Sequence, residues 1–457
     1  MKDFSIMYGI FRQLTMPAIR IFYKEIQIKN FKNLSKSGAV FICSNHVNAF
    51  MDPVSVQLHT SRQIFSLARG DAFSNPFMRW LLTQWKLIPI YRLSEGAENL
   101  KKNNSSLSIS AQVLSKGHPL VIYPEAICIL ERRIRKLKKG AARIAFDVEE
   151  QSDFKAKLVI LPLGLTYSNP KKFRSKLFIN FGEPITATKY SELYKNDKAK
   201  AINELTAEIE KAMKELVVHI QHKENDQLVE DLYIIYKGQL ILGLGLDPTN
   251  LEDDFKVSRD IVDAVNYFQN NDPSLIETVK QKMDQYIKML NEFNLRDHLL
   301  TKDGLRTITD TRVMSDIVTS IIGMPLFLLG LAMNYLPYKL ADTSADKIAK
   351  EVEFHASLNM TIGWFGWIAY YLLQLLVVGS LFGNWLLLAV YAALVPLTGL
   401  FALRFYPLLK KAAGRRRLLG LKENNKIQFE NLIKKREEIM KLLDSAKQKY
   451  CTILKSI

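Results

Sequence analysis

The chain has 457 residues, 48% of them hydrophobic, and a formal net charge of +17. This length is enough for two or three domains, and the positive charge suits nucleic acid, an anionic membrane surface or phosphorylated substrates as partners. The three cysteines, Cys43, Cys128 and Cys451, lie far apart and without metal-ligand spacing, which argues against a disulfide framework or a metal site and fits a reducing, cytoplasmic compartment.

Residues 1–25 are apolar with interspersed basic residues, and they lack the cleavage site of a signal peptide. An apolar face beside Arg12, Arg20 and Lys24 predicts an interfacial helix that lies on a membrane. The sequence leaves a helix packed into a protein core open as the alternative.

Residues 26–188 alternate short apolar runs with helix-like segments, which predicts an α/β domain with a mostly parallel sheet. We expect strands at 39–43, 63–68, 88–91, 119–123, 158–166 and 177–181, and helices at 54–59, 77–85, 105–115 and 139–149. Ligands of such sheets bind beyond the carboxyl ends of the strands. His46, Arg92 and Glu125 each follow a predicted strand, so we expect them to face one crevice.

The first predicted strand leads through a polar loop containing His46 to Asp52 and Pro53, which predict a helix start with Asp52 as its N-cap. Within one helix, His46 and Asp52 would lie roughly 120° apart around the axis, whereas a loop can fold the histidine back onto the carboxylate. A carboxylate on one imidazole nitrogen would leave the other free to accept a proton. An ordinary helix cap beside a hydrogen-bonded histidine is the alternative.

Residues 189–312 are highly charged and show helical periodicity at 199–222, 225–242, 253–270 and 273–293. No motif that carries chemistry lies among them. We expect a helical appendage.

Residues 313–406 contain two uncharged stretches, 317–336 and 358–403, which predict a transmembrane region of two or three helices. The second stretch has 46 residues and would run about 70 Å as one helix, more than two bilayer cores of about 30 Å. We therefore expect it to form two spans with a turn near 379–384.

The orientation of these segments is left open. Seven basic and no acidic residues between 404 and 422 predict the cytoplasmic side, and the α/β domain has no export signal. Two cytoplasmic ends require an even number of crossings, yet there are three segments. The segment 317–336 is the candidate for a re-entrant or interfacial position, because Pro325 lies inside it and Pro337 follows it.

Residues 407–457 form a basic cytoplasmic segment followed by an amphipathic helix from about residue 424. Such a helix can pair with another helix of the chain or support self-association with a second copy.

Four sequence blocks follow one another in an order that is diagnostic when taken together. They are Asn45-His46 with Asp52-Pro53, then Ile88-Pro89-Ile90-Tyr91-Arg92, then Val121-Ile122-Tyr123-Pro124-Glu125, and then Val159-Ile160-Leu161-Pro162-Leu163, with Phe181-Gly182-Glu183-Pro184-Ile185 just after. These blocks resemble the signatures of the glycerolipid acyltransferases. Members of that family acylate glycerol-3-phosphate, dihydroxyacetone phosphate or lysophosphatidic acid.

The resemblance implies an O-acyltransferase without cofactor or metal. His46 would be the general base on the acceptor hydroxyl, and Asp52 would orient and polarise it. The acceptor would attack the acyl thioester of acyl-CoA or acyl carrier protein directly, with no enzyme nucleophile.

The resemblance also implies that Arg92 and Glu125 bind the acceptor's phosphate and hydroxyls, with Pro124 and Pro162 in the third and fourth blocks as further substrate-binding residues. Beyond it, a basic cluster follows Glu125, and a phosphate monoester requires guanidinium or ammonium donors. We expect Arg135 and Lys138 of this cluster to bind the phosphate or an anionic lipid. A solvated face or a membrane-contacting patch is the alternative.

The chain departs from the family pattern at three places. Five residues separate His46 from Asp52, one more than the commoner spacing, which resembles a subset acting on glycerol-3-phosphate or dihydroxyacetone phosphate. Ala126 stands where glycine is usual, and Cys128 stands where a hydroxyl residue is usual. Since glycine serves positive φ or close approach, Ala126 could crowd the acceptor.

We therefore expect an integral membrane acyltransferase, with its active site on the cytoplasmic face of the bilayer, that acylates glycerol-3-phosphate or dihydroxyacetone phosphate in phospholipid synthesis. A lysophosphatidic acid acyltransferase and a non-catalytic lipid-binding membrane protein are the alternatives. Nucleic acid is not expected as a partner, because much of the positive charge clusters beside the apolar segments.

Overall fold

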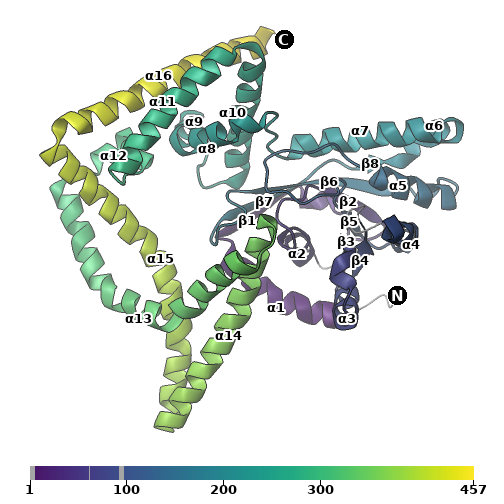
Figure 1. Ribbon diagram of the computed structural model, residues 1–457, viewed down its shortest axis with the longest axis horizontal. Helices are drawn as coiled ribbons and strands as arrows, with labels where there is room; N and C mark the ends of the chain where they lie inside the picture. Colours follow the sequence, from purple (N-terminus) through teal and green to yellow (C-terminus); the bar gives the residue numbers. More distant parts are fainter. Residues whose placement is uncertain (1–5, 61, 92–96, 457) are drawn as a thin grey trace. The chain divides into compact units, whose positions relative to one another are not determined.

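The structure is a computed structural model that describes residues 6–60, 62–91 and 97–456 (Figure 1). It divides into two compact units. The first, here called the α/β unit, comprises the chain up to His219 together with Ser344–Thr361. The second, here called the helical unit, comprises Ile220–Thr343 and Ile362–Ile457.

The α/β unit is built on an eight-stranded sheet, counted over the described residues, with strand order β1-β7-β6-β2-β5-β3-β4 and β8 beside β6. Its strands are β1 (Glu25–Lys29), β2 (Val40–Ser44), β3 (Phe65–Arg69), β4 (Leu87–Ile90), β5 (Leu120–Ile122), β6 (Val159–Tyr167), β7 (Lys176–Phe181) and β8 (Ile185–Thr186). The pairs β6–β7 and β6–β8 are antiparallel, and the other pairs are parallel. The predicted mostly parallel α/β fold is confirmed.

Helices cover both faces of this sheet (Figure 1). They are α1 (Ile6–Phe22), α2 (Met51–Leu58), α3 (Pro76–Gln84), α4 (Ala97–Ser115), α5 (Gly140–Gln151), α6 (Ser191–Asn196) and α7 (Lys198–Leu216). Side chains alternate along β2, so that Phe41 and Cys43 pack with α4, α5 and α7, while Val40 and Ile42 pack with α1 and α2. Because β2 is buried on both faces, its first four residues are all apolar.

Helix α1 has apolar residues on both its buried and its exposed face. Tyr8, Ile19 and Phe22 are buried, and the latter two belong to the core of the sheet. Ile6 and Ile10 on the same helix are exposed. The alternative of a core helix therefore describes its inner face, and an interfacial role for its outer face remains a prediction.

Helix α7 extends the α/β unit beyond the predicted boundary at residue 188. Leu205, Ile209 and Met213 are buried against α5 and the sheet, so the unit ends only at His219. The sequence predicts that α7 is a charged helix, but only its packing against α5 and the sheet assigns it to the α/β unit.

The helical unit contains α8 (Asp226–Ile235), α9 (Lys237–Gly243), α10 (Leu251–Asn271), α11 (Pro273–Glu292), α12 (Lys302–Arg306) and α16 (Lys426–Ser456). Helices α11 and α16 lie side by side (Figure 1). At their contact the buried Arg436 donates to Asp297 at 2.8 Å, and Tyr286 donates to the same carboxylate at 2.8 Å. The amphipathic C-terminal helix thus has a partner within the chain, and self-association stays a prediction.

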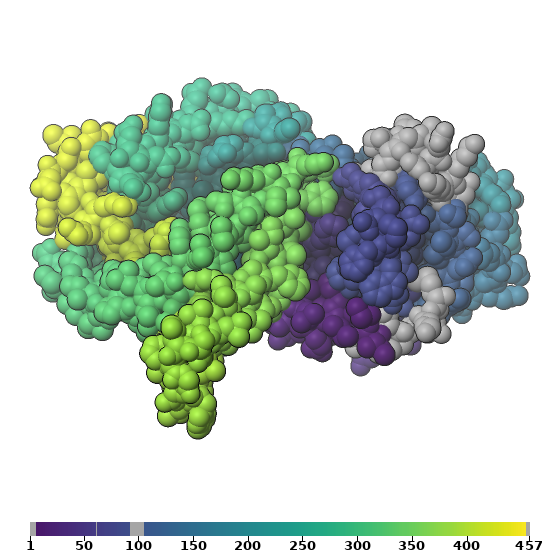
Figure 2. All heavy atoms as spheres, turned by 60° about the horizontal axis from the view of Figure 1, so that its bottom comes forward, coloured from purple at the N-terminus to yellow at the C-terminus, as the bar shows by residue number. Residues whose placement is uncertain are grey.

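Three helices among the described residues are long and apolar enough to cross a membrane, by length and composition. They are α13 (Asp310–Ile348), α14 (His355–Phe382) and α15 (Trp385–Asn424). Helices α14 and α15 form a hairpin whose break at 383–384 falls within the predicted turn. Leu381, Phe382 and Trp385 at the end of the hairpin are exposed. This end projects from the surface in Figure 2, where it is yellow-green.

Candidate active site

The loop after β2 is organised by the carboxylate of Asp52. Helix α2 starts at Met51 and its N-cap position is Phe50, so the prediction that Asp52 caps the helix is wrong. Asp52 lies in the first turn, and its Oδ2 accepts the backbone N–H groups of Val47 and Asn48, each at 2.9 Å. The carboxylate thus binds the amides of the loop rather than those of its own helix.

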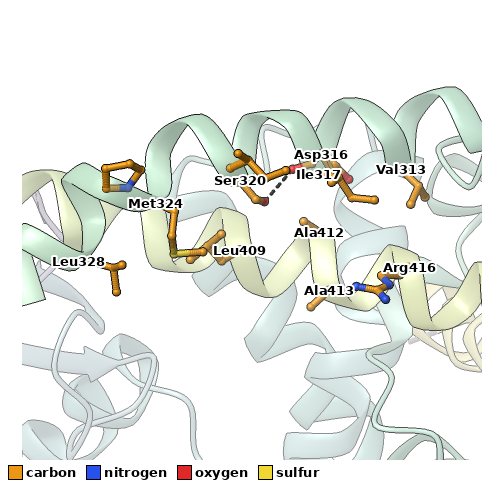
Figure 3. Close-up of a pocket in the computed structure, with 12 residues that line it drawn as sticks. Val313, Asp316, Ile317, Ser320, Met324, Leu328, Leu409, Ala412, Ala413 and Arg416 are labelled. Carbon is orange, nitrogen blue, oxygen red and sulfur yellow. Dashed lines mark hydrogen bonds between the residues drawn. The ribbon is translucent and has the colours of Figure 1, made fainter.

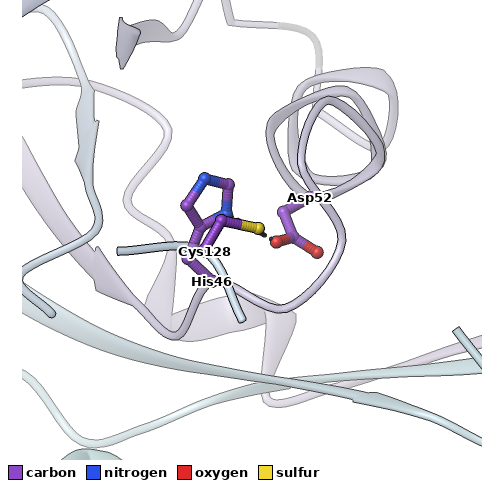
Figure 4. A group of neighbouring side chains, drawn as sticks. All are labelled: His46, Asp52 and Cys128. Carbon is purple, nitrogen blue, oxygen red and sulfur yellow. Dashed lines mark hydrogen bonds and ion pairs between the residues drawn. The ribbon is translucent and has the colours of Figure 1, made fainter. Parts of the chain in front are cut away.

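The same carboxylate holds His46, as predicted (Figure 4). His46 Nδ1 lies 2.7 Å from Asp52 Oδ2, and the side chain of Asp52 is completely buried while that of His46 is 18% exposed. No described residue forms a hydrogen bond with His46 Nε2. The imidazole therefore presents one ring nitrogen to an incoming group while the other is fixed.

Two tyrosines complete the support of this pair. Tyr167, at the end of β6, donates its hydroxyl to Asp52 Oδ1 at 2.6 Å. Burial raises the pKa of Tyr167 well above its usual value, so it remains a donor. The ring of Tyr123 stacks on His46 with centroids 4.0 Å apart and fixes the imidazole plane. Tyr123 is the aromatic residue of the third block, whereas no local signal identified Tyr167.

Glu125 links the two loops of the site. Its Oε1 accepts the backbone N–H of His46 at 3.4 Å, and its Oε2 accepts that of Arg135 at 2.9 Å. Burial raises the pKa of Glu125, although these two N–H groups act in the opposite direction. The preceding residue, Pro124, accepts the backbone N–H of Lys138 at 2.8 Å. Residues 124 and 125 thus fix the course of the loop 126–139.

The remaining predicted substrate-binding residues are dispersed. The guanidinium of Arg135 is exposed and donates to Glu131 at 2.7 Å, and Lys138 is also exposed. Arg92 lies outside the described residues. The structure brings together the side chains of His46 and Asp52 with the carboxylate of Glu125.

Pro162 is buried within β6, opposite Cys43 of β2, and is not at the loop edge of the sheet. Its carbonyl accepts the N–H of Gly182 at 2.8 Å, between the segments of β6 that pair with β8 and β7. A residue without an N–H is tolerated at such a break in the ladder. This position suits a structural role.

The two unusual residues of the loop have distinct environments. Ala126 has φ +58°, the left-handed conformation in which glycine is usual. Cys128 Sγ accepts the backbone N–H of Ala49 at 3.2 Å. The ligand atoms of Cys128, His46 and Asp52 all lie within 4.8 Å of one another, but Cys128 and Asp52 already bind loop amides, so we assign them to holding the loop.

The segment of residues 349–361, here called the connector, links α13 to α14 and includes the first two turns of α14, and it packs beside both loops. Glu353 accepts the backbone N–H of Leu130 at 3.3 Å, and the ring of Phe354 lies 5.8 Å from that of Phe50. Ala356 is buried in the core under the sheet. The chain thus returns from α13 to the edge of the site, which the sequence did not indicate.

Part of the chain is similar to known acyltransferases. Residues 25–166 match the Acyltransferase family model. A stretch of 193 residues is 30% identical to glycerol-3-phosphate O-acyltransferase 1 of Saccharomyces cerevisiae and covers 41% of this chain and 24% of that protein. A stretch of 232 residues is 23% identical to glycerol-3-phosphate O-acyltransferase 2 of the same yeast and covers 50% of this chain and 30% of that protein. The chain therefore matches only a quarter to a third of the length of these relatives.

The chain is also similar to a second fungal protein and to a bacterial structure. An uncharacterized acyltransferase of Schizosaccharomyces pombe is 28% identical over 190 residues, which are 40% of this chain and 26% of that protein. The crystal structure of the 1-acyl-sn-glycerophosphate acyltransferase of Thermotoga maritima aligns with a TM-score of 0.32 and 14% identity, over 45% of this chain and 80% of that one.

Proposed function

Residues 25–166 form a domain of the Acyltransferase family, and from this premise we propose that the protein is a membrane-bound O-acyltransferase that transfers a fatty acyl chain to glycerol-3-phosphate or dihydroxyacetone phosphate. The observation that carries the proposal is the His46–Asp52 pair, with its 2.7 Å contact and the uncommitted Nε2. Acyl-CoA or acyl carrier protein is the donor, and the reaction serves phospholipid synthesis.

The chemistry follows from the orientation of the imidazole. His46 Nε2 accepts the proton of the acceptor hydroxyl while the oxygen attacks the thioester carbonyl. Asp52, bonded to Nδ1, stabilises the imidazolium that forms. The carbon–sulfur bond then breaks, and the proton passes from the imidazolium to the departing thiolate. An ester and a free thiol result, and no covalent enzyme intermediate is formed.

Two observations favour glycerol-3-phosphate or dihydroxyacetone phosphate over lysophosphatidic acid as the acceptor. The spacing of five residues between His46 and Asp52 resembles the subset that acts on the smaller acceptors. The two curated yeast relatives also bear the name glycerol-3-phosphate O-acyltransferase. We assign the acceptor phosphate to Arg92 and to the exposed cations Arg135 and Lys138.

The arrangement of the hydrogen bonds argues against a non-catalytic lipid-binding protein. A buried carboxylate that served only to hold the loop would need no imidazole among its donors. Asp52 instead also holds His46, whose Nε2 forms no hydrogen bond with any described residue.

The connector supports a specific arrangement in the bilayer. No candidate span among the described residues precedes α13, so the chain enters α13 from the side of the α/β unit. It leaves α13 through the connector, which belongs to the α/β unit. Both ends of α13 then lie on the cytoplasmic face, and α13 does not cross the bilayer completely. The hairpin α14–α15 enters the bilayer and returns to the basic segment of α15.

The function is tested with the purified full-length protein in detergent. Acyl-CoA or acyl carrier protein is supplied with glycerol-3-phosphate, dihydroxyacetone phosphate or lysophosphatidic acid, and the lipid product is identified by mass. The wild type should acylate one of the first two acceptors, and His46→Ala should lose at least about a hundredfold in turnover, the contribution of a general base. Equal turnover of wild type and His46→Ala would contradict the mechanism, and lysophosphatidic acid as the best acceptor would contradict the assigned substrate.

A further inference from the structure

Helices α13 and α15 line an open groove of about 610 Å³ within the helical unit (Figure 3). Its lining is mainly aliphatic and ends in two charged residues. The lining residues on α13 include Ile317, Ile321, Met324 and Leu328, and those on α15 include Leu409, Ala412, Ala413 and Arg416. Figure 3 places Arg416 and Asp316 toward one end of this groove and Met324 and Leu328 toward the other.

The groove results from the sizes of the facing side chains. At one position the two helices approach closely, because a Cβ on Gly330 would lie 2.4 Å from the carbonyl oxygen of Thr398. Toward the other end, α15 presents Ala412 and Ala413, which are too small to fill the space opposite Ile317 and Ile321. Ile317, Ile321 and Leu328 on the α13 wall are all exposed, so the groove is open to its surroundings.

The two charged residues at the polar end of the groove differ in whether they have a partner within the protein. Asp316 is held by Arg415 through bonds of 2.5 and 2.9 Å and has Arg312 at 3.8 Å. Arg416 is exposed and forms no hydrogen bond or ion pair with any described residue. The acidic group is therefore neutralised within the protein, and the guanidinium of Arg416 is left to bind an external anion.

We infer that this groove binds a phosphate-bearing acyl lipid, with its phosphate on Arg416 and one acyl chain along the aliphatic wall. The inference rests on the proposed membrane insertion of the helical unit and is independent of acyl transfer. From Val313 to Leu328 the groove follows about 22 Å of helix, which accommodates an extended fatty acyl chain. A soluble phosphate compound would leave that wall uncovered.

The position of the groove along the chain agrees with a lipid headgroup. Beyond Asp316 its α13 wall belongs to the uncharged stretch 317–336, whereas its α15 wall lies among seven basic residues between 404 and 422. Such a boundary between apolar and basic sequence is typical of the level at which phospholipid headgroups meet acyl chains. Anionic headgroups are attracted there, and Arg416 is the cation that lines the groove itself.

The test measures lipid retention by the delipidated full-length protein with native mass spectrometry. Dioleoyl phosphatidic acid is titrated at low ionic strength into the wild type, Arg416→Gln and Lys422→Gln. Lys422 is the matched control, since it is an exposed cation on the same helix outside the groove. Arg416→Gln should weaken binding of the first lipid about tenfold, the effect of one charge-assisted hydrogen bond, and Lys422→Gln should leave it within about twofold.

Two further arms separate the headgroup from the chain. Ala413→Leu should fill the groove and reduce retention even though Arg416 is intact. Millimolar inorganic phosphate should not displace the lipid, because it cannot cover the aliphatic wall. Equal losses in Arg416→Gln and Lys422→Gln, unchanged retention in Ala413→Leu, or displacement by free phosphate would each overturn the inference. Acyl transfer is assayed on the same samples, so an inactive wild type that still retains lipid through Arg416 would count against the proposed function alone.

Discussion

The carboxylate of Asp52 shows how one residue can organise a catalytic loop. It is fully buried, and a buried charge is stable only when its acceptor positions are satisfied. Four donors satisfy it, namely two loop amides, the hydroxyl of Tyr167 and the imidazole of His46. The bonds that make its burial tolerable are therefore the same bonds that fix the loop and direct the imidazole.

Ala126 should be a site of strain, because a left-handed conformation costs an alanine about 1 kcal/mol or more relative to glycine. Ala126→Gly should therefore raise the free energy of unfolding by about 0.5 to 1 kcal/mol, measured by denaturation in detergent. Ala207→Gly is the control, since Ala207 is exposed within α7 and glycine should destabilise a helix interior by about 1 kcal/mol. A loss of stability in Ala126→Gly similar to that of the control would refute the strain.

Glu125 should make stability depend on pH in a defined direction. Burial raises its pKa above the ordinary value of 4.5, so the folded protein binds this proton more tightly than the unfolded chain does. The stability of wild type relative to Glu125→Gln should therefore be greatest below about pH 4.5 and fall as the pH rises through the raised pKa. Unfolding of both proteins across this range provides the measurement. A relative stability that increases with pH would mean that the two backbone donors outweigh burial.

The sequence predicted the residues of the site whose roles depend on short spacings. His46 and Glu125 each follow a predicted strand, Asp52 begins the helix after the first of these loops, and parallel strands bring their carboxyl ends to one edge. Arg92, the third residue predicted at this edge, lies outside the described residues. The sequence did not predict Tyr167, whose hydroxyl reaches Asp52 from 115 residues away, because the register of β6 beside β2 decides that contact. The capping role predicted for Asp52 was wrong because the loop amides compete for the same carboxylate.

At the scale of elements, strands that are buried on both faces were the ones that the sequence predicted most directly. Strands β2, β5 and β6 are buried on both faces and are visible as apolar runs. Strand β1 was missed because its five residues are half-buried and polar ones alternate with isoleucines. The helices near the C-terminus were recognised from length and absence of charge alone, which require no knowledge of tertiary contacts.

The connector should influence catalysis through the loop that it contacts. Glu353 holds the N–H of Leu130, and the neighbouring Ile129 donates its N–H to the carbonyl of His46 at 3.2 Å. Glu353→Ala should lower kcat about threefold to tenfold with little change in KM for acyl-CoA, because one hydrogen bond contributes about 1 kcal/mol. Glu353→Gln, which keeps a carbonyl acceptor, should restore most of the rate.

Glu351→Ala provides the matched control for this positioning role. Glu351 also lies in the connector, but its partner is Arg69 in an exposed ion pair at 3.2 Å. Such pairs contribute about 0 to 1 kcal/mol, so this variant should retain nearly full activity. Similar rates for Glu353→Ala, Glu351→Ala and wild type would show that the connector does not position the loop.

At the scale of the whole molecule, the proposed arrangement in the bilayer has to account for the odd number of apolar helices. Three complete crossings would place the connector and the basic end of α15 on the same face but the start of α13 on the other. The start of α13 cannot lie across the bilayer from the α/β unit, because no candidate span among the described residues separates them. Helix α13 is about 58 Å long and contains Pro325 and Pro337, features that suit a bent helix with both ends on one face.

This arrangement predicts the labelling of single cysteines in sealed membrane vesicles. In a chain whose three native cysteines are replaced, Ser315→Cys before the apolar part of α13 and Lys350→Cys in the connector are both exposed positions. A membrane-impermeant maleimide should label both from the same side, since both ends of α13 lie on the cytoplasmic face in the proposed arrangement. Ser380→Cys, near the end of the hairpin, should resist labelling from that side, because the uncharged stretch 358–403 holds it in or beyond the bilayer. Labelling of Ser315→Cys and Lys350→Cys from opposite sides would establish α13 as a crossing helix, and the contacts of Glu353 and Phe354 with the site loops could then not form in the membrane.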